Sequence, residues 1–168
     1  MFRVGLGFDS HRLSAGRKLV LGGIEVASPL GEEAHSDGDV LLHALCDAIY
    51  GALGKGDIGE HFPDSDARWK GQASRVFLEH AASLAKGEGY SLVNADLTIL
   101  LEKPKLSPHK KKIAENVRQL LRPFWQLPEG SVSIKAKTSE GLDAVGRGEA
   151  ISAQAVVLLS RDRDPDGK

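Results

Sequence analysis

Two short segments hold the residue types that bind a catalytic metal ion. Asp9 and His11 are two positions apart, and residues i and i+2 of an extended segment point to the same side. His43 lies in a segment of helical periodicity. One carboxylate and two imidazoles would give three protein ligands and leave a fourth position open, as in catalytic zinc sites. Each fragment alone also fits a plainer interpretation, a strand end with solvated polar residues and a surface histidine on an amphipathic helix.

Two carboxylates flank His43 on the same helix face. Asp39 lies four residues before it and Asp47 four residues after it, a spacing that brings helical side chains together. Either carboxylate could therefore orient the imidazole ring from behind, as partners of metal-binding histidines often do.

A second group of residues suits phosphate. Lys137, Thr138, Ser139 and Glu140 follow one another, and Arg147 stands between two glycines shortly afterwards. Arginine and backbone N–H groups hold phosphate oxygens, and a carboxylate can share Mg²⁺ with them. A polar hairpin between two strands explains the same residues equally well.

A loop over residues 103–109 contains two prolines, and its free backbone groups could hydrogen-bond the edge of a base. A turn that leads from a strand into a helix with basic residues is the plainer interpretation. Cys46 lies in an apolar helical stretch, which indicates a core residue rather than a nucleophile. The chain has neither a Gly-x-Ser-x-Gly elbow nor a Walker phosphate loop.

Composition limits the class of protein. The chain has 168 residues, 41% hydrophobic and 27% charged, as expected of one soluble globular domain. A net charge of −1 argues against general nucleic-acid binding. A single cysteine, no signal segment and no apolar run of about 20 residues predict a cytoplasmic protein without a membrane span.

The elements that must position these residues alternate between strand and helix. We expect a single domain over residues 1–160 and a charged, frayed tail over 161–168. Ser36 or Asp37 could cap the first helix. The mixture predicts an α+β fold in which helices cover one face of a mixed sheet. The expected elements are strands over 2–8, 91–101, 131–137 and 150–159, a hairpin over 19–26, helices over 39–53 and 71–86, a third helix from Pro108 to Leu121, and a loop over 56–69.

Taken together, these segments resemble the 2-C-methyl-D-erythritol 2,4-cyclodiphosphate synthase family. The similarity extends from residue 3 to about residue 159, and its most specific part is the His-Ser-Asp-Gly-Asp block that begins at His35, with His43 after it. The blocks that carry it, in order, are residues 7–12, 34–44, 56–59, 62–64, 105–109 and 146–149.

The resemblance implies a role for each matching residue. It implies Zn²⁺ at Asp9, His11 and His43, and Mg²⁺ or Mn²⁺ between the substrate phosphates near Glu140. It implies that His35 and Thr138 stabilise the transition state. Ser36, like His35, matches a residue that contacts the substrate. The other matching substrate-binding residues are Asp57, Ile58 and Gly59 near the ribose, Phe62, Pro63, Asp64, Ser65 and Asp66 near the methylerythritol unit, Leu101, Lys105, Leu106, Ser107, Ala136 and Lys137 around the cytidine, and Ser139 and Arg147 near the phosphates.

The resemblance also implies an activity and an assembly. The family cyclises 4-diphosphocytidyl-2-C-methyl-D-erythritol 2-phosphate with release of CMP in non-mevalonate isoprenoid synthesis, as homotrimers with active sites between subunits. A metal-dependent phosphohydrolase and a non-catalytic module that binds a metal or a cytidine nucleotide are the alternatives. The chain departs from the family pattern at Lys137 and at Asp143 and Ala144.

Overall fold

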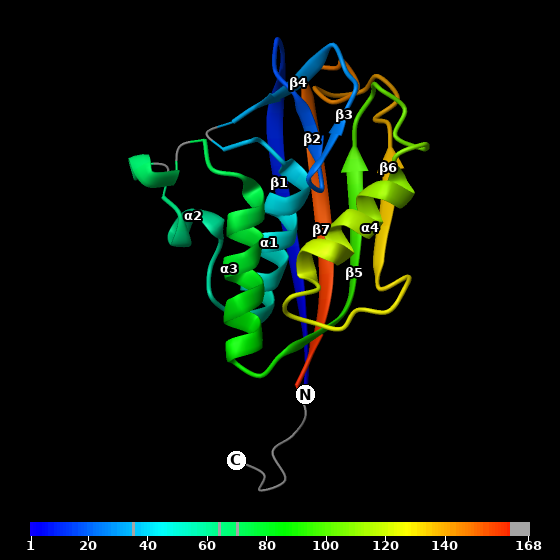
Figure 1. Cartoon of the computed structure of the whole chain (residues 1–168). Helices are drawn as coiled ribbons and strands as arrows, with labels where there is room; N and C mark the ends of the chain where they lie inside the picture. The colour runs from blue at the N-terminus through cyan, green and yellow to red at the C-terminus, as the bar shows by residue number, and fades with distance from the viewer. Residues whose placement is uncertain (35, 64, 70, 162–168) are drawn as a thin grey trace, which may run out of the picture.

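A five-stranded sheet runs through the molecule, and helices cover one of its faces (Figure 1). The computed structural model describes residues 1–34, 36–63, 65–69 and 71–161. The elements are β1 (Phe2–Ala15), β2 (Leu19–Leu21), β3 (Ile24–Val26), β4 (Leu30–Glu33), α1 (Val40–Leu53), α2 (Ile58–His61), η1 (Ala67–Trp69), α3 (Ser74–Gly87), β5 (Ser91–Leu100), α4 (Lys110–Leu121), β6 (Val132–Lys137) and β7 (Ala150–Ser160).

The strand order in the sheet is β4-β1-β7-β5-β6. Only β5 and β6 pair in parallel, and the other neighbours are antiparallel. The strands β2 and β3 form a separate hairpin. This arrangement confirms the predicted α+β fold with a mixed sheet.

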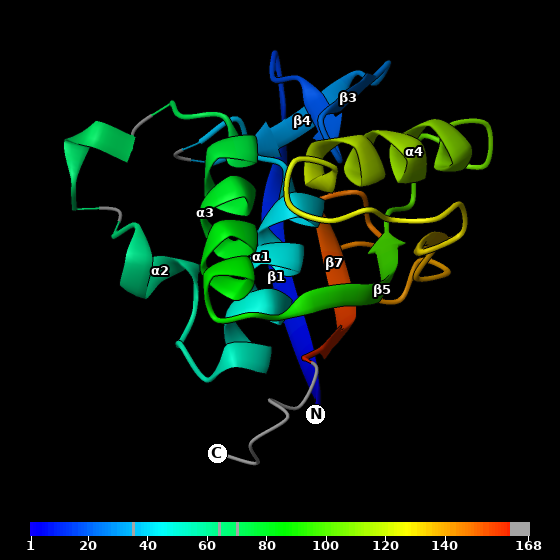
Figure 2. The ribbon, with the colours of Figure 1, turned by 60° about the horizontal axis from the view of Figure 1, so that its bottom comes forward.

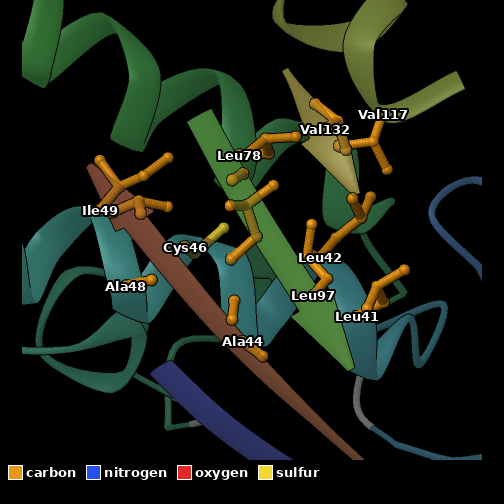
Figure 3. Packing of buried hydrophobic residues seen from close by; sticks show 14 of the residues in the cluster. Leu41, Leu42, Ala44, Cys46, Ala48, Ile49, Leu78, Leu97, Val117 and Val132 are labelled. Atoms are coloured by element: carbon orange, nitrogen blue, oxygen red, sulfur yellow. The ribbon is translucent and has the colours of Figure 1, made fainter. Parts of the chain in front are cut away.

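Helix α1 forms the centre of the core. It packs on β1 and β7, while α3 packs on the other side of α1 and α4 lies over β6 (Figure 2). Because α1 lies between the sheet and α3, side chains around most of its circumference are buried. Figure 3 shows Leu41, Leu42 and Cys46 of α1 among Leu78 of α3 and Leu97 of β5. The expectation that Cys46 fills the core is confirmed.

Two glycines of β1 allow α1 to lie unusually close to the sheet. A Cβ atom at Gly5 would lie 1.8 Å from the carbonyl oxygen of Ala48. At Gly7 it would lie 1.9 Å from the carbonyl oxygen of Ala44. The absence of side chains at these positions sets the distance between β1 and the helix that carries His43.

Several boundaries differ from the expected ones. β1 continues to Ala15, so Asp9 and His11 lie inside a strand rather than at its end. The short strand β4 was not expected, since its sequence LGEE contains no β-branched residue. The expected loop over 56–69 contains α2 and a 3₁₀ turn. Local patterns underestimate such elements because pairing and packing from distant segments stabilise them.

The cap of α1 is also different from the expected one. Asp39, rather than Ser36 or Asp37, precedes the helix and accepts a hydrogen bond from the N–H of Leu42 at 3.1 Å. The same carboxylate accepts the N–H groups of Gly22 and Gly23, so it also fastens the β2–β3 turn to the helix.

The face of β1 that points away from the helices is apolar. Phe2, Val4, Leu6 and Phe8 are each more than half exposed, and Val156 of β7 adds to the same face. The solvated face of an antiparallel sheet ordinarily carries polar side chains. At the end of the sheet, Met1 and Arg161 exchange backbone hydrogen bonds, and the rest of the expected tail lies outside the described residues. Among the described residues, no helix is long and apolar enough to cross a membrane.

Candidate metal centre and active site

Asp9, His11 and His43 meet where β1 passes the first turn of α1. The Oδ2 atom of Asp9 lies 3.0 Å from Nε2 of His11 and 2.9 Å from Nδ1 of His43. One ligand atom from each residue lies within 4.8 Å of the other two. The structure therefore brings together the three ligands expected from the sequence, in a group that could hold a metal ion.

The local fold explains this meeting. Asp9 and His11 share the odd-numbered face of β1 with Gly5 and Gly7, and this face points toward α1. The close approach that the glycines permit places His43 over the strand. A fixed strand and a fixed helix hold the ligands, which suits a site that must be ready before its ligand arrives.

The hydrogen bonds of His11 define its tautomer. Its Nδ1 atom lies 2.8 Å from Oε2 of Glu32 and 2.9 Å from the carbonyl oxygen of Gly38. A carbonyl oxygen can only accept, so Nδ1 carries the hydrogen. The other ring nitrogen, Nε2, faces Asp9 and is available to a metal.

His43 is oriented through a different set of hydrogen bonds. Its Nε2 atom lies 2.8 Å from the hydroxyl of the fully buried Ser74 and 3.1 Å from that of Ser36. The Ser74 hydroxyl donates to the carboxylate of Asp37, so it accepts from His43. This assigns the hydrogen of His43 to Nε2 and leaves Nδ1 facing Asp9.

The two carboxylates expected to orient His43 have other partners. Asp39 caps α1 and binds backbone N–H groups. Asp47 accepts the N–H of Ile58 at 2.8 Å. The prediction for Asp39 and Asp47 is wrong. Helical spacing brings both carboxylates near the ring of His43, but their oxygens accept hydrogen bonds from backbone N–H groups instead.

Burial and hydrogen bonding oppose each other in this cluster. Burial raises the pKa of Asp9, but the hydrogen bonds to His11 and His43 outweigh it and hold the pKa well below its usual value. Burial lowers the pKa of His11, but the hydrogen bonds to Asp9 and Glu32 raise it to about 10. Burial raises the pKa of Glu32 to about 7, against the hydrogen bond from His11. A metal that binds Nε2 must therefore displace a proton from His11.

The three ligands form one wall of a cavity of about 560 Å³. An aromatic wall of Phe62, Trp69 and Phe77 stands beside it, with the rings of Phe62 and Phe77 4.6 Å apart. A polar wall next to an apolar one suits a ligand with a charged part and a hydrocarbon part. The residues expected from the sequence that line the cavity are Asp9, His11, Ser36, His43, Ile58, Gly59, Phe62, Ser65 and Asp66.

Helix α2 brings Ile58 and Gly59 to the cavity. Asp57 caps it by accepting the N–H of Glu60 at 3.0 Å, and Asp47 of α1 accepts the N–H of Ile58. His61 stacks on Tyr50 with 4.1 Å between ring centroids. A helix of only four residues has little stability of its own, so these contacts with α1 fix its position.

The second group of expected residues lies elsewhere. Figures 1 and 2 show α2 and the end of β5 on opposite sides of the molecule. In this second group, Thr138 donates to Glu140 at 2.6 Å, and Arg147 pairs with Glu149. None of its described residues lines the cavity. Its members are Leu101, Lys105, Leu106, Ser107, Ala136, Lys137, Thr138, Ser139, Glu140 and Arg147.

Burial divides this second group. The side chains of Leu101 and Leu106 belong to the core, which leaves only their backbone groups for a ligand. Lys105, Ser107 and Glu140 are exposed. Pro63, which was expected near the methylerythritol unit, is exposed and does not line the cavity. His35 and Asp64, also expected in the site, lie outside the described residues.

Some residues of the site were not expected from the sequence. Glu32 and Ser74 hold the rings of the two histidines, and Trp69 and Phe77 line the cavity. The pair Glu32-Glu33 was a visible signal, because only Ala34 separates these two acidic residues from the His-Ser-Asp-Gly-Asp block. No sequence pattern pointed to Ser74 and Phe77, because they belong to α3 and lie at least 31 residues after His43 in the sequence.

Known proteins are similar to this chain over nearly its full length. A protein of Pelobacter propionicus named 2-C-methyl-D-erythritol 2,4-cyclodiphosphate synthase is 51% identical over 157 residues, which is 94% of this chain and 97% of that protein. A solved structure of 2C-methyl-D-erythritol-2,4-cyclodiphosphate synthase in a CDP-bound form matches with a TM-score of 0.85 and 47% identity, covering 94% of this chain and 100% of the other.

A longer protein contains the same unit. The bifunctional IspDF of Campylobacter jejuni matches with a TM-score of 0.90 and 37% identity over 96% of this chain, which spans 43% of that protein. The YgbB family model matches residues 2–160. These similarities confirm the resemblance seen in the sequence motifs: the chain belongs to the YgbB family.

Proposed function

We propose that the chain converts 4-diphosphocytidyl-2-C-methyl-D-erythritol 2-phosphate to 2-C-methyl-D-erythritol 2,4-cyclodiphosphate and CMP, in non-mevalonate isoprenoid synthesis. The observation that carries the proposal is the convergence of Asp9, His11 and His43 on the wall of a cavity. Relatives about half identical over nearly the full length carry the name of this synthase.

The reaction is an internal phosphoryl transfer. An oxygen of the 2-phosphate forms a bond to the β-phosphorus of the same molecule, and the bond from that phosphorus to the oxygen of CMP breaks. The attacking phosphate is already ionised, so no strong general base is needed. Phosphoryl transfer then depends on positioning and on stabilisation of charge. Holding the two ends in line can contribute about 7–11 kcal/mol in favourable cases.

The chain's own residues suit this positioning. The aromatic wall of Phe62, Trp69 and Phe77 can exclude water from the reacting phosphates, which protects the ring-forming reaction from hydrolysis. Ser36 lines the same cavity. We assign the methylerythritol unit to this cavity, with Ser65 and Asp66 at its edge.

Two divalent metals complete the proposal. Asp9, His11 and His43 would hold Zn²⁺ or another transition metal, and Glu140 would hold Mg²⁺ or Mn²⁺ for the substrate phosphates. The nitrogen and oxygen donors of the first set match what zinc prefers. When bound, the metals supply Lewis-acid stabilisation of phosphate charge and a template for the reacting ends. His35 and Thr138 would stabilise the transition state, with Thr138 held to Glu140 by a hydrogen bond.

The remaining residues are assigned to the nucleotide and its phosphates. Asp57, Ile58 and Gly59 would lie near the ribose, and Ser139 and Arg147 near the phosphates. The proposed cytidine pocket consists of Leu101, Lys105, Leu106, Ser107, Ala136 and Lys137.

We further propose a homotrimer with active sites between subunits. Within one chain, the metal ligands lie apart from the second group of expected residues, which includes Glu140. A neighbouring subunit would therefore have to bring its own Glu140 and the residues around it to the metal ligands. The apolar face of β1 supplies a surface for such an assembly, because Phe2, Val4, Leu6 and Phe8 are exposed together. A cytoplasmic location, inferred from the single cysteine, belongs to the same proposal.

The test is phosphorus NMR of the purified protein with the diphosphocytidyl substrate and Mg²⁺, before and after removal of zinc. We expect CMP and a cyclic diphosphate in equal amounts, lost when zinc is removed and restored when it is added. A linear phosphate product would instead identify a hydrolase. Intact substrate in the presence of both metals, with CDP bound, would identify a binding module.

A further inference from the structure

Glu32 is a buried carboxylate next to the metal ligands that the proposed reaction does not use. It lies on β4, beside β1, and its side chain is fully shielded from solvent. Its Oε2 atom lies 2.8 Å from Nδ1 of His11 and 3.1 Å from the N–H of Val40, at the start of α1. Its Oε1 atom has no hydrogen-bond partner within the described part of the chain.

Such a carboxylate is costly for the fold. An ionised group with an unpaired oxygen in the interior loses hydration that its remaining hydrogen bonds do not replace. A cation nearby offsets this cost. The donors of Asp9, His11 and His43 converge on a point on the other side of the His11 ring from Glu32.

We propose that Glu32 is a positioning residue for the metal ion: it holds His11 with Nδ1 protonated and Nε2 turned toward Asp9, and its charge strengthens the binding of a divalent cation. The inference deepens the proposed function and rests on its metal site. A histidine that binds metal through one nitrogen and donates to a carboxylate through the other is both oriented and made more basic.

The carbonyl of Gly38 shares the same Nδ1 hydrogen, but it does not replace Glu32. A carbonyl is neutral, so it orients the ring without adding charge. Glu32 instead adds a negative charge directly behind a ligand, and a buried charge of opposite sign favours a cation in a largely buried site.

The hydrogen bond between Glu32 and the N–H of Val40 connects the ring of His11 to α1, the helix that carries His43. One carboxylate oxygen holds both His11 of β1 and the first N–H of α1. The two histidines are therefore held partly by the same atom, so Glu32 contributes to the distance between them as well as to the tautomer of one.

The experiment compares zinc affinity in the metal-free wild type, Glu32→Gln and Glu25→Gln, by competition with a fluorescent chelator. Glutamine has the same shape and its amide oxygen can accept both hydrogen bonds, so Glu32→Gln removes mainly the charge. Glu25 is exposed and paired with Lys18, so Glu25→Gln removes an equal charge at the surface. Circular dichroism of each metal-free variant controls for folding.

We expect zinc affinity about 10–100-fold weaker in Glu32→Gln and unchanged in Glu25→Gln. Affinity within twofold of the wild type in Glu32→Gln would overturn the inference while leaving the proposed metal site intact. A wild type that does not bind zinc would overturn the metal site and this inference together.

A second measurement needs no variant. Nitrogen–proton correlation NMR of the histidine rings in the zinc-loaded wild type reports which nitrogen of His11 carries hydrogen. We expect a protonated Nδ1 with a strongly downfield proton, as a carboxylate acceptor causes, and a metal-bound Nε2. The opposite tautomer would overturn the inference even if Glu32→Gln did not fold.

Discussion

Each ligand of the candidate metal site is held by at least one other side chain. His11 donates to Glu32, His43 donates to Ser74, and Asp9 lies between the two rings. The same carboxylate oxygen of Asp9 therefore lies against one ring nitrogen of each histidine, and these are the two nitrogens that a cation would bind. At the scale of the residue, the site is organised for a cation before the cation binds.

Replacing His43 with alanine removes one of three ligands. We expect turnover to fall about a thousandfold or more, because a metal ion contributes several kcal/mol of charge stabilisation. The metal-free fold should persist, since His43 lies at the edge of the core. Activity measured by CMP release, with circular dichroism for the fold, tests this. Ser83→Ala, at an exposed position on α3, serves as the control and should keep wild-type turnover. Retained turnover in His43→Ala would refute the metal assignment.

Binding of zinc should release a proton. The pKa of His11 is about 10 without metal, so its ring is charged at pH 7.5, and Nε2 must lose its hydrogen to bind. The apparent affinity for zinc should therefore rise with pH, up to about pH 10. Calorimetry at pH 7.5 in buffers of different ionisation enthalpy should give about one proton released per zinc. Release of no proton would show that His11 is already neutral.

At the scale of the element, the contact between β1 and α1 matters most. The strand supplies two of the ligands and the helix the third, and Gly5 and Gly7 determine how near they come. The site is thus sensitive to a change that touches no ligand.

Gly7→Ala tests this sensitivity. The added methyl group would meet the carbonyl of Ala44, which is helix backbone and cannot rotate away. We expect a loss of about 1–3 kcal/mol or more in unfolding free energy, measured with denaturant, and weaker zinc binding. Gly87→Ala is the matched control, because no atom lies within 4 Å of its Cβ position, and it should be neutral or slightly stabilising. Equal stability of Gly7→Ala and the wild type would contradict the role given to this contact.

At the scale of the whole molecule, one face of the sheet has no cover within the chain. The even-numbered residues from Phe2 to Phe8 of β1 expose a row of large apolar side chains, while Gly5 and Gly7 on the other face lie against α1. A row of exposed apolar side chains of this kind indicates an interface.

Leu6→Asp should therefore dissociate the proposed homotrimer. Leu6 is 68% exposed in the single chain, so the charge should not disturb the subunit fold. Light scattering after gel filtration should give the mass of a single chain. Turnover should be lost as well, because in the proposed trimer the Glu140 half of the site would come from a neighbour. Ser83→Asp, which adds the same charge on the exposed surface of α3, should leave a trimer. A wild type of one-chain mass would contradict the trimer directly.

Local patterns in the sequence were sufficient for much of this molecule. Periodicity identified α1, α3, β5 and β7 because each makes its contacts along one regular face. It missed β4, which is short and is held by pairing with β1, and α2, whose Ile58 N–H donates a hydrogen bond to Asp47 of α1. Elements that depend on distant partners leave little local trace.

The same division applies to the candidate site. By itself the sequence determined which chemistry was available, and the spacing of Asp9 and His11 placed both on one face of a strand. The resemblance to the family already implied that His43 joins them. Only the tertiary structure decided that Ser74 rather than Asp39 or Asp47 holds the ring of His43, and that Glu32 stands behind His11. The reason is physical: periodicity specifies the direction in which a side chain leaves its own element, whereas its partner depends on how closely two elements pack, and here two glycines set that distance.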